Sequence, residues 1–410
     1  MKYVIIGSGI AGITAAKTIR SLDSNGEIHI YSDEETLYYP KPKLFDLIYE
    51  NLKARDIYYY DSFWYNSNAI NLHLGVGIRK IDAKEHIILL EDGGTIKYDR
   101  VLLANGASTF VPQIDGVYTP GVFTLRNISD AFKIKRHSLL IGNHKPVVVI
   151  GGGVLGLEAA HAFMRNKLYP TVIESFPYLL PRQLDKEGAD ILRGIFENWG
   201  IQIKTDSFIE KIEGNSNIER VILSNGTIIK AEMVLLSTGI SSNVDLLERS
   251  GLPYKKGAVV DDYLQVTEDV YAAGDVAEHR GIVYGIIPPA IEQATIAARN
   301  MARPGSAVYD GSVPTNTLKV AGFDFTSVGN INPDEKDPQY EIIRAKAPVE
   351  GKYRKIVLKD GKVEGIIILG IKGEAVIANK LVKMHTDVSS YKDKLRNIDF
   401  SLKETSIIRE

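Results

Sequence analysis

Two glycine-rich segments of the same form constrain this chain more than any other feature of its sequence. The first is Gly-Ser-Gly-Ile-Ala-Gly, from Gly7 to Gly12, and the second is Gly-Gly-Gly-Val-Leu-Gly, from Gly151 to Gly156. Each follows a short apolar run rich in β-branched residues and opens a stretch with helical periodicity. In such a segment the first glycine makes a tight turn, the second lets backbone N–H groups approach a pyrophosphate, and the third lets the helix pack on the strand. The sequence therefore predicts two α/β units that each bind a dinucleotide.

The pattern around both segments is strand, helix, strand. Strands are expected at residues 2–6 and 28–31 around a helix at 11–22, and again at 146–150 and 171–173 around a helix at 155–166. The two segments start 144 residues apart, which is too long a period for a solenoid and suits two similar domains.

Hairpin signals lie between and after these units. Residues 86–90 and 95–97 flank the turn Asp92-Gly93-Gly94, and the turn Asp360-Gly361 lies in a third region that begins near residue 315. The last 20 residues or so are polar and charged, and we expect them to be poorly ordered.

An acidic residue after the second strand of each unit would bind a ribose hydroxyl. In the second unit this residue is Glu174, whose carboxylate favours a free 2′-hydroxyl and repels a 2′-phosphate. No basic residue follows it before Arg182, so the sequence predicts NADH rather than NADPH. In the first unit Ser32 stands at the usual acid position, and either Asp33 or Glu34 could serve instead.

Composition excludes several chemistries. The 410 residues include no cysteine, so this chain has no disulfide, thiolate nucleophile or cysteine-bound metal cluster. Basic and acidic residues number 49 and 51, which gives no bulk electrostatic reason to bind nucleic acid. The eight histidines show no metal-ligand spacing, and no apolar run is long enough for a membrane span. We therefore expect a cytoplasmic protein without a metal site.

Four further segments carry a resemblance to a known family. They are Leu102–Ala107, which contains Ala-Asn-Gly; Ser237–Gly239; Val270–Asp275; and Pro289–Ala294. With the glycine segments, they resemble the pyridine nucleotide–disulfide oxidoreductase superfamily, and within it the rubredoxin reductase, ferredoxin reductase and nitrite reductase large-subunit group. The resemblance covers residues 1–330 well and the rest loosely.

This resemblance implies FAD and NAD as cofactors and a glutathione reductase-like fold. Two Rossmann-like domains are expected with a small α+β C-terminal interface domain. The FAD-binding domain would comprise residues 1–112 and 240–314, the NAD(H)-binding domain 113–239, and the interface domain 315–410. The residues assigned to cofactor binding are Gly7, Gly9, Ile10, Ala11, Gly12, Asp33, Glu34, Lys41, Ala104, Gly106, Gly151, Gly153, Val154, Leu155, Gly156, Glu174, Gly239, Gly274, Asp275 and Glu292.

Lys41 and Glu158 are the predicted catalytic residues. The segment from Tyr38 to Leu44 is similar to one that packs at the flavin of rubredoxin reductases, and Glu158 matches a glutamate near the flavin and nicotinamide of relatives. We expect a Lys41–Glu158 ion pair that stabilises the anionic reduced flavin. Lys43 could take this role, or Lys41 could be a solvated loop residue.

One assignment keeps an alternative, and one position departs from the pattern of the relatives. Asp275 is expected to bind FAD, and the other reading is an N-cap of a following helix. Where ferredoxin reductase relatives carry a lysine, this chain has Asp46.

The resemblance implies hydride transfer from NADH to FAD, followed by electron transfer to an acceptor. Because cysteine is absent, disulfide reduction is excluded, and a one-electron carrier such as a rubredoxin or ferredoxin is the expected partner. Oxygen or a small organic acceptor is the alternative, as is a flavin–NADH sensor resembling apoptosis-inducing factor, or a subunit that needs a partner chain. The basic run 133–137 could receive an acidic iron–sulfur carrier, or be a solvated helix face. The C-terminal region could support a homodimer.

Overall fold

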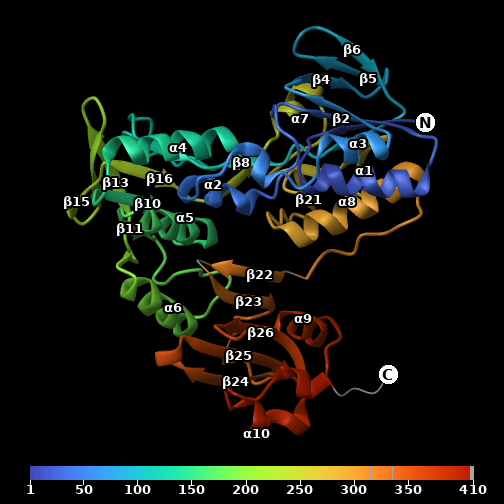
Figure 1. Ribbon diagram of the computed structural model, residues 1–410. Helices are drawn as coiled ribbons and strands as arrows, with labels where there is room; N and C mark the ends of the chain where they lie inside the picture. Colours follow the sequence, from blue (N-terminus) through green and yellow to red (C-terminus); the bar gives the residue numbers. More distant parts are fainter. Residues whose placement is uncertain (314, 321, 335, 407–410) are drawn as a thin grey trace. The chain divides into compact units, whose positions relative to one another are not determined.

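The computed structural model describes residues 1–313, 315–320, 322–334 and 336–406 (Figure 1). Contacts within the chain divide it into two units. The first comprises residues 1–47, 51–109 and 240–312, and the second comprises 48–50, 110–239 and 313–410. The first unit is therefore discontinuous, and residues 110–239 are inserted into it. Whether the second unit divides into a nucleotide-binding and a C-terminal domain stays a prediction.

The first unit is built on a six-stranded sheet with the order β19-β20-β7-β1-β2-β3, parallel except for the β19–β20 pair. Its strands are β1 (Lys2–Ile6), β2 (Glu27–Ser32), β3 (Ile70–Leu74), β7 (Arg100–Leu103), β19 (Gln265–Thr267) and β20 (Val270–Ala272). β1 is central, and its apolar side chains are buried because neighbouring strands flank it and helices cover it. The helices α1 (Ile10–Leu22) and α8 (Ile287–Ala302) pack side by side against this sheet (Figure 1).

Smaller elements complete the first unit. They are α2 (Leu44–Tyr49), α3 (Ser62–Ser67), α7 (Asp245–Ser250), the antiparallel meander β4 (Ile78–Asp82), β5 (Ile87–Leu90) and β6 (Thr95–Lys97), and the pairs β8 (Ala107–Thr109) with β17 (Ile240–Ser242) and β18 (Ala258–Val260) with β21 (Ala277–His279). The 3₁₀ turns are η1 (Lys41–Lys43) and η2 (Ala54–Ile57). The predicted hairpin across Asp92 is confirmed.

The second unit contains a five-stranded parallel sheet with the order β12-β11-β10-β16-β9. Its strands are β9 (Val122–Thr124), β10 (Pro146–Ile150), β11 (Tyr169–Ile173), β12 (Gln202–Lys204) and β16 (Met233–Leu236), with helices α4 (Ile128–Ile141), α5 (Val154–Arg165) and α6 (Lys186–Asn198). A separate antiparallel sheet holds β13 (Ile209–Gly214), β14 (Ile218–Leu223) and β15 (Ile228–Lys230). The predicted strand–helix–strand order around both glycine segments is confirmed.

The C-terminal part of the second unit is an antiparallel sheet with the order β22-β23-β26-β25-β24. It comprises β22 (Thr315–Val320), β23 (Phe323–Gly329), β24 (Tyr340–Ala347), β25 (Lys352–Lys359) and β26 (Lys362–Leu369), joined by η3 (Pro348–Glu350) and followed by α9 (Ala375–Lys383). The turn at Asp360 joins β25 to β26, as predicted. The small α+β C-terminal region of the expected fold class is thus present.

The expectation of a poorly ordered end is wrong as far as residue 406. The chain there forms η4 (Ser389–Tyr391), α10 (Lys392–Leu395) and η5 (Leu402–Ser406). Leu395 and Leu402 are buried in the core beneath the C-terminal sheet, which ties an otherwise polar segment down. Residues 407–410 lie outside the described part of the chain. None of the described helices is long and apolar enough to cross a membrane.

Candidate functional site: two glycine cradles

The first glycine segment forms a turn that only glycine fits. Gly7 has a φ of +111°, and its N–H donates to the carbonyl oxygen of Tyr31 at 2.7 Å. A Cβ on Gly7 would lie 2.2 Å from the carbonyl oxygen of Ala104, and one on Gly12 would lie 2.0 Å from that of Gly7. Gly9, the N-cap of α1, differs because a Cβ there would meet no protein atom within 4 Å. Protein packing explains two of the three glycines, and the space beside Gly9 is left for a ligand that approaches the backbone.

The second glycine segment repeats this geometry. Gly151 also has a φ of +111°, and its Cβ would lie 2.2 Å from the carbonyl oxygen of Ser237. A Cβ on Gly156 would lie 1.9 Å from the carbonyl oxygen of Gly151, whereas one on Gly153 would again meet no protein atom within 4 Å. Neither α1 nor α5 has an acidic residue in its first turn, so both helix N-termini can attract a phosphate.

The turns Gly7–Gly12 and Gly151–Gly156, each with the start of the helix that follows, are termed the first and the second cradle. Glu174 lies beside the second cradle. Its side chain is buried, and its Oε2 accepts a hydrogen bond of 2.7 Å from the N–H of Gly152. Its Oε1 accepts from the N–H of Phe176 at 2.9 Å. The carboxylate therefore lies beside the glycine turn, where the sequence predicted a ribose-binding acid, and Arg182 is exposed.

The first cradle uses a hydroxyl where the second uses a carboxylate. Ser32 is buried at the end of β2, and its Oγ accepts a hydrogen bond of 2.9 Å from the Oγ of Ser8. The N–H of Glu34 also donates to Ser32 Oγ, at 3.2 Å. Of the two open candidates, Asp33 is exposed and Glu34 is half-buried with its carboxylate turned to other side chains.

Glu34 joins the predicted flavin segment to this cradle. Its Oε2 accepts a hydrogen bond of 2.5 Å from the hydroxyl of Tyr39, and its Oε1 lies 2.7 Å from the Nζ of Lys41. Lys43 instead pairs with Asp46 at 2.8 Å. Glu158 is half-buried on α5 in the second unit. A Lys41–Glu158 pair therefore stays a prediction.

The remaining predicted FAD residues come from strands whose carboxyl ends share one edge of the first sheet. Gly274 follows β20 with a φ of +83°, and its N–H donates to the Oε1 of buried Gln293 at 2.9 Å. Asp275 precedes β21, not a helix, so the N-cap alternative is wrong. Ala104 is tied to β1, since its N–H donates to the carbonyl oxygen of Ile6 at 2.8 Å.

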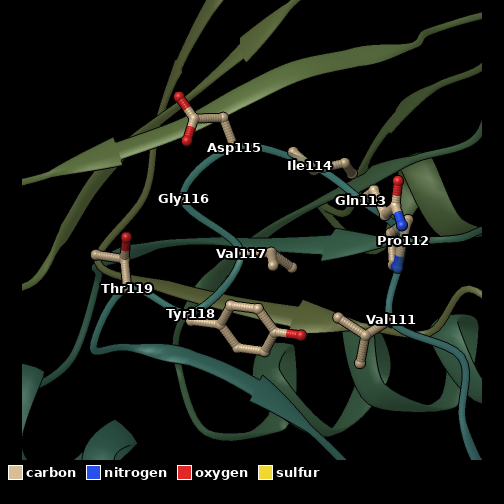
Figure 2. Close-up of a pocket in the computed structure, with 9 residues that line it drawn as sticks. All are labelled: Val111, Pro112, Gln113, Ile114, Asp115, Gly116, Val117, Tyr118 and Thr119. Carbon is tan, nitrogen blue, oxygen red and sulfur yellow. The ribbon is translucent and has the colours of Figure 1, made fainter.

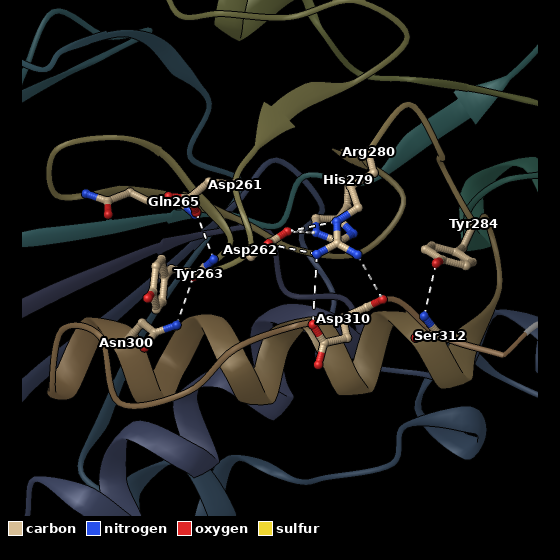
Figure 3. Close-up of polar contacts among 10 residues, drawn as sticks. All are labelled: Asp261, Asp262, Tyr263, Gln265, His279, Arg280, Tyr284, Asn300, Asp310 and Ser312. Atoms are coloured by element: carbon tan, nitrogen blue, oxygen red, sulfur yellow. Dashed lines mark hydrogen bonds and ion pairs between the residues drawn. The ribbon is translucent and has the colours of Figure 1, made fainter. Parts of the chain in front are cut away.

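Glu292 lies on α8 and binds the segment at which the chain leaves the first unit. Its carboxylate accepts a hydrogen bond from the hydroxyl of Ser312. The N–H of Ser312 donates to the hydroxyl of Tyr284 at 3.0 Å (Figure 3). Asn300 lies further along the helix, where its Nδ2 donates to the carbonyl oxygen of Tyr263 at 2.9 Å. These bonds fix α8 with respect to the sheet edge.

Two buried polar atoms near this edge lack a protein partner in the described part of the chain. Thr36 Oγ1 and Asn105 Oδ1 are buried and make no hydrogen bond within the described residues. Buried polar groups in folded proteins are almost always paired, so unpaired ones are what a bound cofactor satisfies. The residues present thus fit a dinucleotide at the first cradle.

Asn105 has a role that sequence reasoning missed. Its Nδ2 donates to the carbonyl oxygen of Asn243 at 3.0 Å, and the Nδ2 of Asn243 donates to the carbonyl oxygen of Asn105 at 2.7 Å. This reciprocal pair joins the two segments that leave and re-enter the first unit. Its members are 138 residues apart, so no local pattern could have revealed it.

A hollow lined by residues 111–119 lies elsewhere in the second unit (Figure 2). These residues lead into the amino end of β9, whereas Gly151 follows the carboxyl end of the parallel strand β10. Ligands of such sheets bind at the carboxyl edge, and the residues that line the hollow include neither the glycine turn nor Glu174.

The basic run 133–137 lies on α4. Lys135 donates to the carbonyl oxygen of Glu50 at 2.6 Å, and Arg136 is exposed beside Phe132, Leu139 and Leu140. Its role as a carrier-binding surface stays a prediction.

Comparison with known proteins gives consistent results. Residues 1–300 match the family described as pyridine nucleotide-disulphide oxidoreductase, and residues 314–386 match the rubredoxin NAD⁺ reductase C-terminal domain. The chain is 31% identical over 390 residues to a nitrite reductase [NAD(P)H] of Bacillus subtilis, covering 95% of this chain and 48% of that protein. It therefore spans about half the length of that relative.

A second relative matches along its whole length. The NADH-rubredoxin oxidoreductase of Clostridium acetobutylicum is 30% identical over 399 residues, covering 97% of both chains. The crystal structure of an NADH:rubredoxin oxidoreductase from the same organism superposes with a TM-score of 0.76 and 27% identity, over 94% of this chain and 96% of that chain.

Proposed function

Because the chain belongs to the pyridine nucleotide-disulphide oxidoreductase family, whose members use FAD and NAD(H), we propose that it is an NADH oxidoreductase that passes electrons to a one-electron carrier protein such as a rubredoxin or ferredoxin. The observation that carries this proposal is the presence of two glycine cradles in a chain without cysteine. Two cradles supply a place for a donor nucleotide and for a bound flavin. The absence of cysteine leaves no thiol in this chain to carry electrons onward.

Bound FAD would supply the redox chemistry, since it accepts a hydride and can release electrons singly. The contribution of the chain is binding and orientation. The N–H groups at the starts of α1 and α5 would hold the two pyrophosphates, and Glu174 would accept hydrogen bonds from the ribose hydroxyls of NADH. Lys41 would place a positive charge where the reduced flavin is negative.

A second candidate follows from the half-length match to the nitrite reductase. In this alternative the acceptor centre lies on a partner chain, and the two cradles deliver electrons to it. Oxygen or a small organic molecule as acceptor would need the same residues. A cytoplasmic location and a homodimer stay predictions of the sequence.

The test is an anaerobic visible spectrum of the purified protein before and after one equivalent of NADH. We expect a flavin band that NADH bleaches quickly and NADPH slowly, followed by rapid turnover with a rubredoxin. Fast bleaching without turnover with any rubredoxin or ferredoxin would favour the partner-chain candidate. A protein that stays colourless when FAD is added would contradict the proposal as a whole.

A further inference from the structure

The loop between Glu174 and α6 rests directly on the second cradle. The N–H of Leu180 donates to the carbonyl oxygen of Gly152 at 3.2 Å. Leu179 lies over the same glycine, because a Cβ on Gly152 would be 2.7 Å from Leu179 Cδ2. Both leucines are buried. The shape of this loop therefore determines the space beside the glycine turn and Glu174.

Leu180 adopts a conformation that leucine rarely takes. Its φ is +53°, in the left-handed region where a side chain costs conformational energy. Such a residue persists only where its surroundings hold it in place. One contact that keeps Leu180 in this conformation is its hydrogen bond to Gly152. The other comes from the opposite end of the loop.

That opposite end is held by the C-terminal sheet. The N–H of Leu184 donates to the carbonyl oxygen of Leu180 at 2.8 Å, and Asp185 follows as the N-cap of α6. The hydroxyl of Tyr353 donates to Oδ2 of Asp185 at 2.7 Å, and the Nζ of Lys355 lies 3.2 Å from the same oxygen. Asp185 thus joins the loop to β25.

The groups on β25 are buried to an extent unusual for polar residues. Tyr353 and Lys355 are 0% and 1% exposed and share one face of the strand, whereas Arg354 points to the opposite face. Burial and the Asp185 carboxylate raise the pKa of Tyr353, so its hydroxyl stays a donor. Arg344 adds a further positive charge, with its Nε 3.7 Å from Asp185.

The contacts near α6 reinforce the same attachment. The Nδ2 of Asn332 donates to the carbonyl oxygen of Leu184 at 3.1 Å, so the residue before the cap is also held. A Cβ on Gly188 would lie 3.0 Å from the Tyr353 ring, which shows how closely the first turn of α6 approaches β25.

We propose that Tyr353 and Lys355 are positioning residues for nucleotide binding, which act through Asp185 to hold the 175–184 loop against the second cradle. The C-terminal sheet then contributes to NAD(H) affinity without touching the nucleotide. This inference rests on the proposed function only in that the second cradle binds NAD(H).

The test compares two faces of β25. Tyr353→Phe removes the hydroxyl that binds Asp185 and keeps the ring against Gly188. Glu374→Gln is the matched control, because Glu374 pairs with Arg354 on the opposite face, with 3.5 Å between Arg354 Nη1 and Glu374 Oε2. Both variants are purified with FAD bound, and calorimetry measures the Kd for NAD⁺ and for ADP-ribose.

We expect Tyr353→Phe to raise both Kd values about 5-fold, the effect of losing one hydrogen bond. The KM for NADH should rise with kcat unchanged, and the flavin content and its reduction by dithionite should stay as in the wild type. Glu374→Gln should lower the unfolding temperature at least as much as Tyr353→Phe does, without changing either Kd. Equal Kd values in Tyr353→Phe and wild type would overturn the proposal.

A second pair of variants tests the same proposal if Tyr353→Phe folds poorly. Asp185→Asn retains a good N-cap but leaves Lys355 as a buried charge without its carboxylate. It should raise the Kd for NAD⁺, and adding Lys355→Met should restore part of the affinity. No restoration in the double variant would contradict the role of Lys355. A wild-type protein that binds neither NAD⁺ nor ADP-ribose would instead refute the nucleotide site itself.

Discussion

The two glycine cradles are alike in backbone and unlike in the residue at the end of the second strand. Gly7 and Gly151 share the same φ, and a Cβ on either would lie 2.2 Å from the carbonyl oxygen of the residue that follows the neighbouring strand. Beside them, however, stand the hydroxyl of Ser32 in the first unit and the carboxylate of Glu174 in the second. The backbone geometry that we propose receives a pyrophosphate is thus common to both, and side chains would distinguish the two nucleotides.

The acidic residues beside the two cradles also differ in their partners. In the first unit the carboxylate of Glu34 accepts hydrogen bonds from Tyr39 and Lys41. In the second, the Glu174 carboxylate accepts hydrogen bonds from the backbone of Gly152 and Phe176 and from the hydroxyl of Ser175. This contrast suits a retained flavin in one unit and a nucleotide that must leave after each turnover in the other.

The largest expected effect comes from variants that each disrupt one of the two cradles. Gly156→Ala places a Cβ against the carbonyl oxygen of Gly151, and we expect a 10- to 100-fold rise, roughly, in the Kd for NADH with flavin content unchanged. Gly12→Ala should instead yield protein with little flavin that still binds ADP-ribose. Gly194→Ala on α6 is the control, since a Cβ there meets no atom within 4 Å. Loss of both nucleotides from either variant would show that the cradles are not independent.

The next largest effect comes from replacing Glu174, the side chain that differs between the two cradles. Glu174→Arg removes the ribose-binding carboxylate and adds a charge that attracts a 2′-phosphate. The ratio of kcat/KM for NADH to that for NADPH should fall by about 100-fold, measured as flavin reduction. Glu219→Arg, an exposed site on β14, is the control for added charge. An unchanged ratio would remove Glu174 from nucleotide selection.

A smaller effect concerns Lys41, the cation that pairs with Glu34 beside the first cradle. Lys41→Met should slow flavin reduction by NADH about 10-fold and lower the flavin potential, because the reduced anion loses a nearby positive charge. Lys43→Met is the matched control, since Lys43 pairs with Asp46. Stopped-flow absorbance and a redox titration measure the two quantities. If Lys43→Met alone had these effects, the role would pass to Lys43.

The smallest effect concerns the pH dependence of stability at His161, on the helix that follows the second cradle. His161 on α5 is half-buried 5.5 Å from the Trp199 ring, and burial holds its pKa below the ordinary value of 6.5. As pH falls through 6.5 the unfolded chain takes up a proton that the folded chain resists, so stability above this pH is partly lost below it. His161→Gln should therefore raise the unfolding temperature near pH 5 by on the order of 2 °C, with no gain at pH 8. Trp199 fluorescence in a Trp64→Phe background reports on this unit, and a gain equal at both pH values would contradict the assignment.

Local patterns predicted the parts of the structure that local physics determines. Both strand–turn–helix starts, the hairpins at Asp92 and Asp360 and the place of Glu174 follow from residues within about 25 positions of one another. The C-terminal end was misjudged because Leu395 and Leu402 are sparse in a polar sequence, and only the sheet that covers them makes them core residues.

Two of the contacts that sequence reasoning missed join distant residues. The Asn105–Asn243 pair and the Asp185–Tyr353 bond span 138 and 168 residues. The choice between Asp33 and Glu34 also stayed open in the sequence, although Tyr39 and Lys41, the partners of Glu34, are only 5 and 7 residues away. Such contacts leave no periodic trace, and a single sequence cannot reveal them.

The discontinuity of the first unit has a consequence for the order in which the chain folds. β20, which pairs with β7 in the sheet of the first unit, comes from residues 270–272, whereas the parallel sheet of the second unit uses only residues 122–236. During synthesis from the N-terminus, the inserted sheet can therefore close before the unit that contains residue 1. The closing of β20 onto β7 across this long separation is the slow kind of step. The sheet that begins with β1 is therefore complete only after residues 270–272 have been made.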